Sequence, residues 1–408
     1  MRKIIIVGGG ASGLMACCTA LTNPENEIIL IEKNEKLGKK IYITGKGRCN
    51  LTNDVDPSEF FSNVVNNPKF LFSSIYTFAP QNTIDFFENN GLKIKIERGN
   101  RVFPLSDKSS DVIKTFEKIL NNNRVKIMLN TLVKDLIIEN GAIKGVKTDN
   151  GIFYADSVLI ATGGISYPLT GSTGDGYTFA KKVGHKIIPP IPALCGIVTE
   201  TEDVKKLQGL TLKNVRLTVK NLDKTIHEDF GELLFTHFGI SGPLVLTCSS
   251  IINRLNFSNL KILLDLKPAL SIEKLDARIT RDISEEFSNK TILSLLRNLA
   301  PSSLADVLIK RLGVSKDRKC SNFSKQERER LIILLKNFEI KIRSLRPISE
   351  AIVTSGGISV KEINPKTMES KLVKNLFFAG EVLDVDAFTG GFNLQIAFST
   401  GYSAGLNL

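Results

Sequence analysis

Six residues near the N-terminus, Gly8-Gly9-Gly10-Ala11-Ser12-Gly13, have the spacing G-x-G-x-x-G. They follow the β-branched, apolar stretch Ile4–Val7 and open a run of small and apolar residues that is typical of a helix. A second apolar strand then ends at Glu32, about twenty residues after the turn. This order predicts a dinucleotide-binding unit, in which the glycines let a pyrophosphate approach the N-terminus of the helix. An ordinary glycine-rich turn is the alternative interpretation.

The residue at the end of the second strand narrows the choice of dinucleotide. Glu32 can accept hydrogen bonds from a ribose diol, and an acid there disfavours a 2′-phosphate, so FAD or NAD fits better than NADP. Four short β-like runs, at 125–129, 133–139, 142–148 and 152–154, predict an antiparallel β-meander with Asn-Gly turns. The meander leads to Ala161-Thr162-Gly163-Gly164, where an NAD domain would continue with plain βα units. We therefore expect non-covalently bound FAD.

The C-terminal part of the chain supports the same expectation. A strand over 376–379 runs into Gly380-Glu381 and Asp384, which can place an acid near a ribityl chain. Asn393 and Leu394 then precede a helix expected over 396–405, whose N-terminus would stabilise negative charge on a reduced flavin. A simple docking helix at the C-terminus is the alternative.

These motifs and several longer strings together resemble a bacterial family of FAD-dependent flavoproteins described as aminoacetone-oxidase-like or bile-acid-reductase-like. The resemblance spans nearly the whole chain. The matching segments are Gly8–Gly13, Gly38–Lys40, Ile43–Asn53, Arg101–Pro104, Ala161–Asp175, Gly231–His237, Gly239–Pro243, Pro365–Lys371, Gly380–Asp386 and Thr389–Gln395. This chain departs from the family pattern at Lys46, Ala387, Phe392 and Ile396.

The resemblance implies where individual residues lie along the cofactor. It places Glu32 and Lys33 at the adenosine end and Val133 at the adenine through its backbone. It places Glu381, Asn393 and Leu394 towards the flavin. The remaining expected cofactor residues lie along the cofactor or within the matching strings, and they are Lys39, Lys40, Thr44, Gly45, Arg48 and Cys49.

Three side chains are candidates for the chemistry beyond the flavin. His237, just before the turn 239–243, is the first candidate for substrate contact or proton transfer, with a structural role as the alternative. Arg48 is a candidate to bind an anionic substrate, to offset charge on the reduced flavin or to contact the pyrophosphate. Tyr167 is a candidate proton donor or a packing residue. Cys49, beside Arg48, would have a lowered pKa if it were a reactive thiol.

Composition limits the partners. The chain has 54 Lys and Arg against 42 Asp and Glu, a net charge of +12 that attracts anions without specifying which. The six cysteines have no C-x-x-C spacing, so we expect a reducing, cytoplasmic location and no metal site. No stretch reaches the roughly 18 apolar residues that span a bilayer, so no membrane partner is expected. A small-molecule substrate ranks above nucleic acid, and oligomeric state stays open.

The expected fold is α/β: a Rossmann-like, FAD-binding domain of the two-dinucleotide-binding type, discontinuous in sequence, with inserted parts. Its segments are 1–190 and 346–408, with a boundary at the proline-rich stretch 189–192. Residues 191–268, with part of 341–350, are expected to form a β-rich substrate domain. Residues 269–340 are expected to form a helical subdomain.

The leading hypothesis is an FAD-dependent oxidoreductase that moves hydride between flavin and a small organic substrate. The chain has no second G-x-G-x-x-G in a βαβ context, so NAD(P)H would act as a transient donor. An oxygen-using, amine-oxidase-like enzyme is the first alternative. A flavin-dependent RNA-modifying enzyme and a flavin-holding sensor or partner-binding protein belong to other classes.

Overall fold

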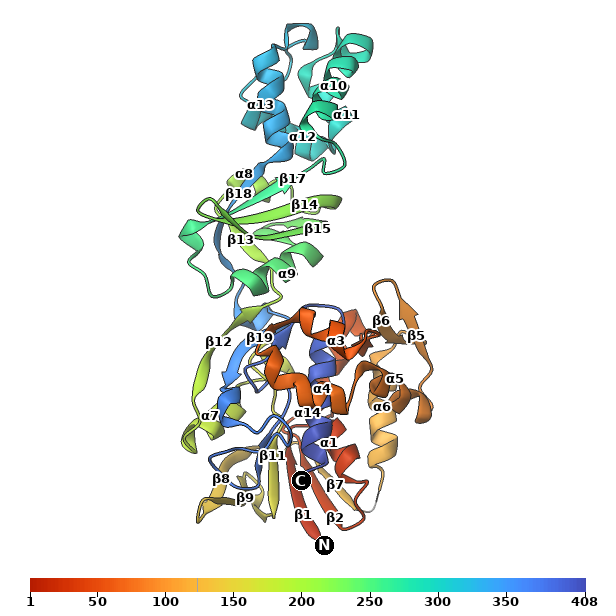
Figure 1. The fold of residues 1–408 in the computed structure, drawn as a ribbon, viewed down its shortest axis with the longest axis vertical. Helices are drawn as coiled ribbons and strands as arrows, with labels where there is room; N and C mark the ends of the chain where they lie inside the picture. Colours follow the sequence, from red (N-terminus) through yellow and green to blue (C-terminus); the bar gives the residue numbers. More distant parts are fainter. Residues whose placement is uncertain (123) are drawn as a thin grey trace. The chain divides into compact units, whose positions relative to one another are not determined.

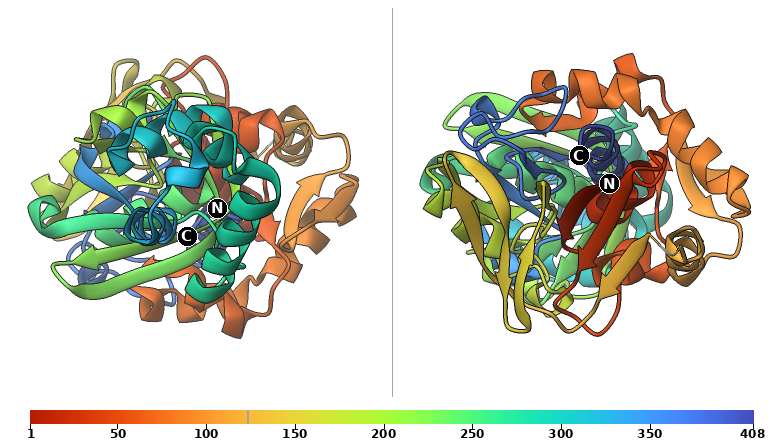
Figure 2. Two further views of the ribbon diagram at one scale, coloured as in Figure 1. Left: turned by 90° about the horizontal axis from the view of Figure 1, so that it is seen from above. Right: turned by 90° about the horizontal axis from the view of Figure 1, so that it is seen from below.

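The computed structural model describes residues 1–122 and 124–408, which divide into two compact units (Figure 1). The first unit comprises Met1–Ala193 and Pro347–Leu408, and the second comprises Leu194–Arg346. Each unit has its own cluster of buried apolar side chains. Both chain termini belong to the first unit and lie near each other in all three ribbon views (Figures 1 and 2).

A five-stranded parallel sheet forms the centre of the first unit, in the order β20-β11-β1-β2-β7. The strands are apolar because the sheet is buried, and Ile4, Ile5 and Ile6 of β1 have no exposed surface. The mixed α/β, Rossmann-like fold expected from the sequence is thereby confirmed. The strands are β1 (Arg2–Val7), β2 (Asn26–Ile31), β7 (Val125–Met128), β11 (Ser157–Ile160) and β20 (Leu376–Phe378).

One strand lies elsewhere than the sequence pattern indicated. The run at 125–129 was expected in the antiparallel β-meander, but β7 pairs in parallel with β2. The meander has the other three runs, with NG turns between them. Its strands are β8 (Val133–Glu139), β9 (Ala142–Thr148) and β10 (Gly151–Tyr154). Periodicity within a short strand does not encode its partner, which explains the error.

Two helices from opposite ends of the chain pack closely together in the first unit. They are α1 (Ala11–Ala20) and α14 (Phe392–Gly405). A Cβ added at Gly401 of α14 would lie 2.3 Å from the carbonyl oxygen of Ser12, so only glycine permits this approach. The C-terminal helix is therefore part of the nucleotide-binding domain.

The proline-rich stretch is a strand rather than a hinge. β12 (Ile187–Ala193) pairs antiparallel with β19 (Val353–Ile358), and its register shifts between Ile188 and Ile191. Proline lacks an N–H and is accommodated at such an irregularity. The remaining elements of the first unit that bear on the site are α2 (Lys39–Ile43), β3 (Thr52–Asn53), β4 (Val64–Asn66), α4 (Phe72–Thr77), α5 (Pro80–Asn89), β5 (Ile94–Glu97), β6 (Arg101–Pro104), α6 (Ser109–Leu120), α7 (Asp175–Lys182) and β21 (Asp386–Ala387).

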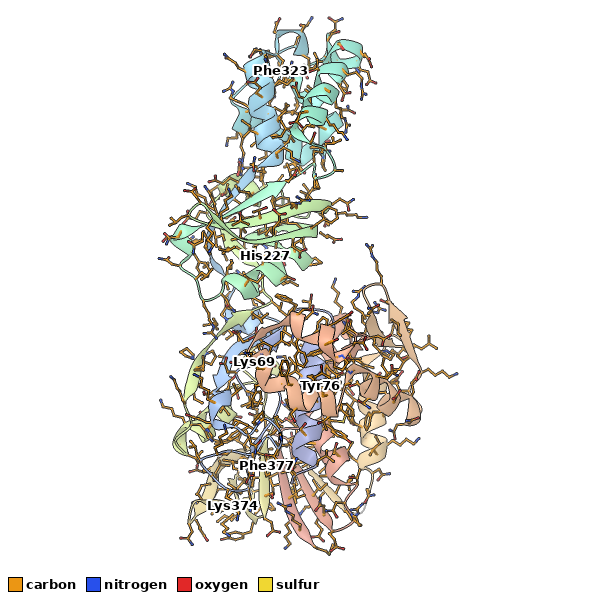
Figure 3. All side chains as sticks on the ribbon, in the orientation of Figure 1. Lys69, Tyr76, His227, Phe323, Lys374 and Phe377 are labelled. Atoms are coloured by element: carbon orange, nitrogen blue, oxygen red, sulfur yellow. The ribbon has the colours of Figure 1, made fainter. Side chains whose placement is uncertain are left out.

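The second unit contains a closed barrel in the order β13-β16-β15-β14-β17-β18, the helices α8 (Glu202–Lys205) and α9 (Pro243–Ile252), and four further helices from the continuous stretch 272–336. In Figure 3, His227 is labelled on the barrel and Phe323 in the helical part. The strands are β13 (Ile197–Thr199), β14 (Thr211–Asn221), β15 (Lys224–Thr236), β16 (Gly239–Ser241), β17 (Leu260–Asp265) and β18 (Phe338–Leu345). The four further helices are α10 (Ile272–Asp282), α11 (Ile292–Leu299), α12 (Ser302–Leu312) and α13 (Lys325–Lys336). Within the described residues, no helix is both long and apolar enough to cross a membrane.

Candidate cofactor-binding site

The glycine-rich turn after β1 has the geometry of a phosphate cradle. Gly8 has φ +109°, and a Cβ on it would lie 2.4 Å from the carbonyl oxygen of Ala161. A Cβ on Gly13 would lie 1.9 Å from the carbonyl oxygen of Gly8, whereas one on Gly10 would meet no atom within 4 Å. Gly10 is the N-cap of α1, and no side chain caps that helix. The first N–H groups of α1 therefore face open space and suit an anion.

Glu32, directly after β2, is held against this turn. Its Oε2 accepts a hydrogen bond from the Gly9 N–H at 2.8 Å. Its Oε1 accepts from the backbone and side-chain amides of Asn34, at 2.9 and 2.6 Å. The carboxylate is almost fully buried and its remaining lone pairs can accept hydroxyl hydrogens, as a ribose diol would require.

Lys33, expected at the adenosine end, and Lys39, another expected cofactor residue, each form an ion pair with an acid. Lys33 Nζ lies 2.6 Å from Asp175 Oδ2 and also contacts Thr173 Oγ1. Lys39 Nζ lies 3.2 Å from Glu35 Oε2. The pairing acids compensate both charges, so neither lysine is a bare phosphate ligand in this structure. Sequence reasoning did not identify Asp175 as a partner, although it lies in a matching string.

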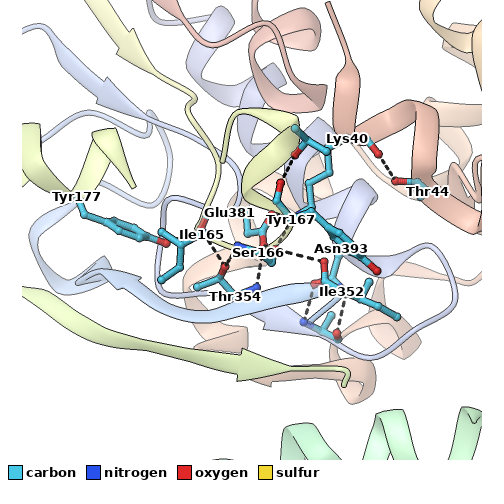
Figure 4. Close-up of polar contacts among 12 residues, drawn as sticks. Lys40, Thr44, Ile165, Ser166, Tyr167, Tyr177, Ile352, Thr354, Glu381 and Asn393 are labelled. Atoms are coloured by element: carbon cyan, nitrogen blue, oxygen red, sulfur yellow. Dashed lines mark hydrogen bonds and ion pairs between the residues drawn. The ribbon is translucent and has the colours of Figure 1, made fainter. Parts of the chain in front are cut away.

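A polar network joins four separate segments beside the turn (Figure 4). Lys40 Nζ lies 2.7 Å from Glu381 Oε2 and donates to Ser166 Oγ at 2.6 Å. Ser166 Oγ in turn donates to Glu381 Oε1 at 3.0 Å, and the Thr354 N–H donates to the same oxygen at 2.8 Å. The network fixes the carboxylate of Glu381, which the sequence assigned to the flavin end. Neither Ser166 nor Thr354 was among the expected site residues: Ser166 lies within the matching string 161–175 without having been singled out, and Thr354 lies in β19, outside every matching string.

The C-terminal segment contacts the N-terminal turn directly. A Cβ on Gly380 would lie 2.5 Å from Ser12 Oγ, and Ser12 Oγ donates to the Ala379 carbonyl at 3.3 Å. Asn393 binds Ala387 twice, accepting from its N–H at 2.9 Å and donating to its carbonyl at 2.7 Å. Asn393 thus holds the loop before α14 in shape.

Asp384 and Leu394, two further expected residues of this segment, contact other parts of the first unit. The Asn67 side chain donates to Asp384 Oδ2 at 3.0 Å, and Leu394 packs partly buried against the core.

The loop around Arg48 is tightly wound and its cation is neutralised. Arg48 pairs with Asp107 at 2.6 Å and also with Glu97, and its guanidinium lies 4.2 Å from the centre of the Phe103 ring. The hydrogen bonds that Arg48 donates to Glu97 and then to Asp107 raise its pKa above the usual value. Cys49 is fully buried, and burial raises the pKa of its thiol to about 12. The lowered pKa expected for Cys49 is therefore wrong, because desolvation outweighs the nearby cation.

The other expected residues lie near these elements. The Ala161 N–H bonds the Val7 carbonyl at 2.8 Å, continuing β11 beside β1, and Thr44 Oγ1 donates to the Lys40 carbonyl at 2.9 Å. Gly45 and Gly163 have positive φ, and Val133 begins β8, where it is buried. Tyr167, half-buried beside Ser166, has φ +50° although it is not glycine. His237 is exposed on the turn between β15 and β16 of the second unit.

Two buried oxygens test whether these segments suit a dinucleotide. Asn50 Oδ1 and Thr162 Oγ1 are buried and have no hydrogen-bond partner in the part of the chain that the structure describes. Each belongs to a segment that the sequence assigned to the cofactor, and an unpaired buried polar atom is costly unless a ligand completes it. Together with the glycine cradle and Glu32, they fit FAD.

Comparison with known proteins supports this interpretation. A family model described as HI0933-like protein Rossmann domain matches residues 2–407. A 3-dehydro-bile acid delta(4,6)-reductase from Clostridium scindens is 30% identical over 99% of this chain and 98% of its own length. A ribosomal RNA dihydrouridine synthase from Haemophilus influenzae is also 30% identical, over 99% of this chain and 98% of that protein.

Solved structures show the same fold at low identity. The quinol fumarate reductase FrdA of E. coli aligns with a TM-score of 0.52 at 16% identity, over 100% of this chain and 70% of that one. The 3-ketosteroid delta1-dehydrogenase of Sterolibacterium denitrificans aligns with a TM-score of 0.52 at 12% identity, over 99% of both chains. At such identities the likeness concerns the fold alone.

Proposed function

The chain belongs to the HI0933-like family of Rossmann-domain, FAD-dependent oxidoreductases, and on that premise we propose that it reduces a carbon–carbon double bond conjugated to a carbonyl group. The names of two full-length relatives support this reaction class. A 3-dehydro-bile acid delta(4,6)-reductase and a dihydrouridine synthase both saturate such a bond, in a steroid ring and in a uracil ring respectively. The shared chemistry, rather than either substrate, is what we carry over.

The observation that carries the proposal is the cradle built from both chain ends in the first unit. The N-terminus of α1 would hold the pyrophosphate, and Glu32 would hold the ribose. Lys40, Ser166 and Glu381 would line the cofactor towards its flavin. Bound FAD supplies hydride transfer, and the protein supplies position and protons.

We propose Tyr167 as the donor of the proton that adds to the α-carbon of the double bond, after hydride has added to the β-carbon. Tyr167 follows Ser166, which the Lys40–Glu381 pair holds in place, and its left-handed backbone is the kind of local strain found at functional sites. Arg48 is bound by two carboxylates, so we assign it to holding its loop or an anionic group.

NAD(P)H is the proposed transient donor, and anaerobic spectroscopy tests it. The FAD-loaded protein is mixed with NADH or NADPH, and the absorbance of oxidised flavin is followed. A 3-keto-4-ene steroid or a uridine-containing RNA is then added, and the product is examined by mass spectrometry for two added hydrogens. We expect bleaching by one nicotinamide and reoxidation by one of the acceptors.

A Tyr167→Phe variant separates the two half-reactions. Bleaching by the nicotinamide should be unchanged, while reduction of the acceptor should slow by about 10²-fold or more. Bleaching by an amine with oxygen as reoxidant, and none by either nicotinamide, would contradict the reductase assignment and favour an oxidase.

A further inference from the structure

A row of lysines crosses three adjacent strands of the barrel in the second unit (strands labelled in Figure 1). Lys220 of β14 lies directly opposite Lys261 of β17, and Lys261 lies directly opposite Lys341 of β18. Side chains opposed in this way point to the same face, with their strands about 5 Å apart. The residues on either side of Lys261 and Lys341 are buried in the barrel, so the row faces outward. Arg343, two residues after Lys341, is exposed and extends the row.

The charges of the row are not neutralised by ion pairs within the described residues. In the described ranges, none of these four cations forms an ion pair. Two acids lie at the Lys341 end of the row: Glu339, two residues earlier on β18, and Glu200, whose N–H bonds the Lys341 carbonyl, line one surface pocket together with Lys341. Like charges directly opposite on a ladder are destabilising. A barrel that needed only solubility would gain stability from mixed signs at these positions.

The net charge of the chain is concentrated in the same unit. Residues 194–346 contain 26 Lys and Arg against 18 Asp and Glu, which is +8 of the total +12. This unit is little more than a third of the chain. A surface of this kind attracts a polyanion, and a small neutral acceptor makes no use of it.

We propose that the row Lys220–Lys261–Lys341, extended by Arg343, binds the phosphate backbone of an RNA that carries the reducible base. The inference rests on the proposed function, because it names the acceptor class for that reaction. Phosphate contacts position a nucleic acid without reading its sequence, and a line of evenly spaced cations suits that role. The full-length relative named for ribosomal RNA favours RNA over an anionic membrane as the polyanion.

Salt-dependent binding tests the surface. A Lys220→Gln/Lys261→Gln/Lys341→Gln variant of the FAD-loaded full chain is titrated with a fluorescein-labelled RNA hairpin that has uridines in its loop. The slope of log Kd against log salt should fall by about 0.7–0.9 per lysine, because each phosphate contact releases counterions. At low salt we expect affinity to weaken by about 10²-fold.

The matched control removes three lysines from the helical part of the same unit. Lys316, Lys319 and Lys325 are exposed, and within the described residues they form no ion pairs. The variant Lys316→Gln/Lys319→Gln/Lys325→Gln has the same net charge as the row variant and should keep the parental slope. The proposal is overturned if both variants lose the same RNA affinity, or if the row variant loses none. It is also overturned if the row lysines are needed for binding to phosphatidylserine vesicles but not to RNA.

Two readouts keep the surface separate from the reaction. Removing like charges that lie opposite each other should leave the melting temperature unchanged or raise it. If the triple variant misfolds, the single Lys261→Gln variant replaces it, and its slope of log Kd against log salt should fall by the amount expected for one lysine. Bleaching by NAD(P)H and reduction of a small enone should be unchanged in the row variant. If the parent reduces nothing but binds RNA through the row, the proposed function fails and the surface stands. If the parent reduces an acceptor but binds RNA independently of the row, the RNA-binding surface is rejected and the proposed function stands.

Discussion

Gly10 and Gly13 lie in the same turn, yet alanine should affect them in opposite ways. A methyl group at Gly13 would lie 1.9 Å from a backbone oxygen, so Gly13→Ala must shift the turn, at a cost of about 1–3 kcal/mol in the free energy of unfolding. At Gly10 the methyl group meets nothing within 4 Å and φ is −87°, which alanine adopts freely. Gly10→Ala should therefore cost the apoprotein less than about 1 kcal/mol, the difference between N-cap residues.

Gly10→Ala, the milder substitution for the stability of the apoprotein, should have a large effect on FAD binding. The open space at Gly10 is where a pyrophosphate would meet the helix, so Gly10→Ala should weaken FAD binding about tenfold or more, equivalent to roughly 1.4 kcal/mol. Urea unfolding of the apoproteins gives the stability changes, and flavin fluorescence titration gives the affinities. Parental FAD affinity in Gly10→Ala, or an apoprotein as stable as the parent in Gly13→Ala, would refute the cradle geometry.

Three further predictions concern the side chains around the site and the fold. Because the Lys40–Glu381 pair is partly buried, Lys40→Met and Glu381→Gln should each lower the free energy of unfolding by about 2 kcal/mol. The loss in the double variant should be about 1–3 kcal/mol smaller than the sum of the two single losses, because the second substitution removes a charge that has already lost its partner. Urea unfolding of the parent and the three variants measures this, and additive losses would exclude coupling. Because burial raises the pKa of Cys49 to about 12, the thiol should resist iodoacetamide at pH 8 in the native protein, and rapid native alkylation at Cys49 by mass spectrometry would contradict this. Burial lowers the pKa of His185 below 6.5 in spite of its contact with Glu362, so below about pH 6.5 the unfolded state binds more protons than the folded state and the protein should become less stable. Thermal unfolding between pH 8 and 5 should show a smaller loss of stability in His185→Gln than in the parent, and equal losses in the two proteins would contradict this.

The sequence predicted much of the site because local spacing encodes local backbone. The glycine spacing of 8–13, the acid at Glu32 and the return of the chain at 376–381 all appear in one cradle. The helix expected over 396–405 is present as α14, which begins four residues earlier, at Phe392.

Local sequence patterns did not predict which strands pair when they lie far apart in the chain. The strand at 125–128 joined the parallel sheet rather than the meander, and the prolines of 189–192 lie in a strand that pairs with 353–358. Neither partner is marked in the sequence, because a strand's pattern specifies which face is buried and not which neighbour covers its edge.

The sequence by itself determined the residues of the glycine turn, since these depend on contacts a few residues apart. It indicated the fold class and the cofactor type through the order of its motifs along the chain. Only the tertiary structure decided that Lys40 and Glu381, far apart in the chain, form a direct ion pair, and that Ser166 and Thr354 donate hydrogen bonds to the same carboxylate. Only it showed that Arg48 is neutralised and Cys49 desolvated. Charge and pKa depend on distance and burial in space, and neither quantity is a property of neighbouring residues in sequence.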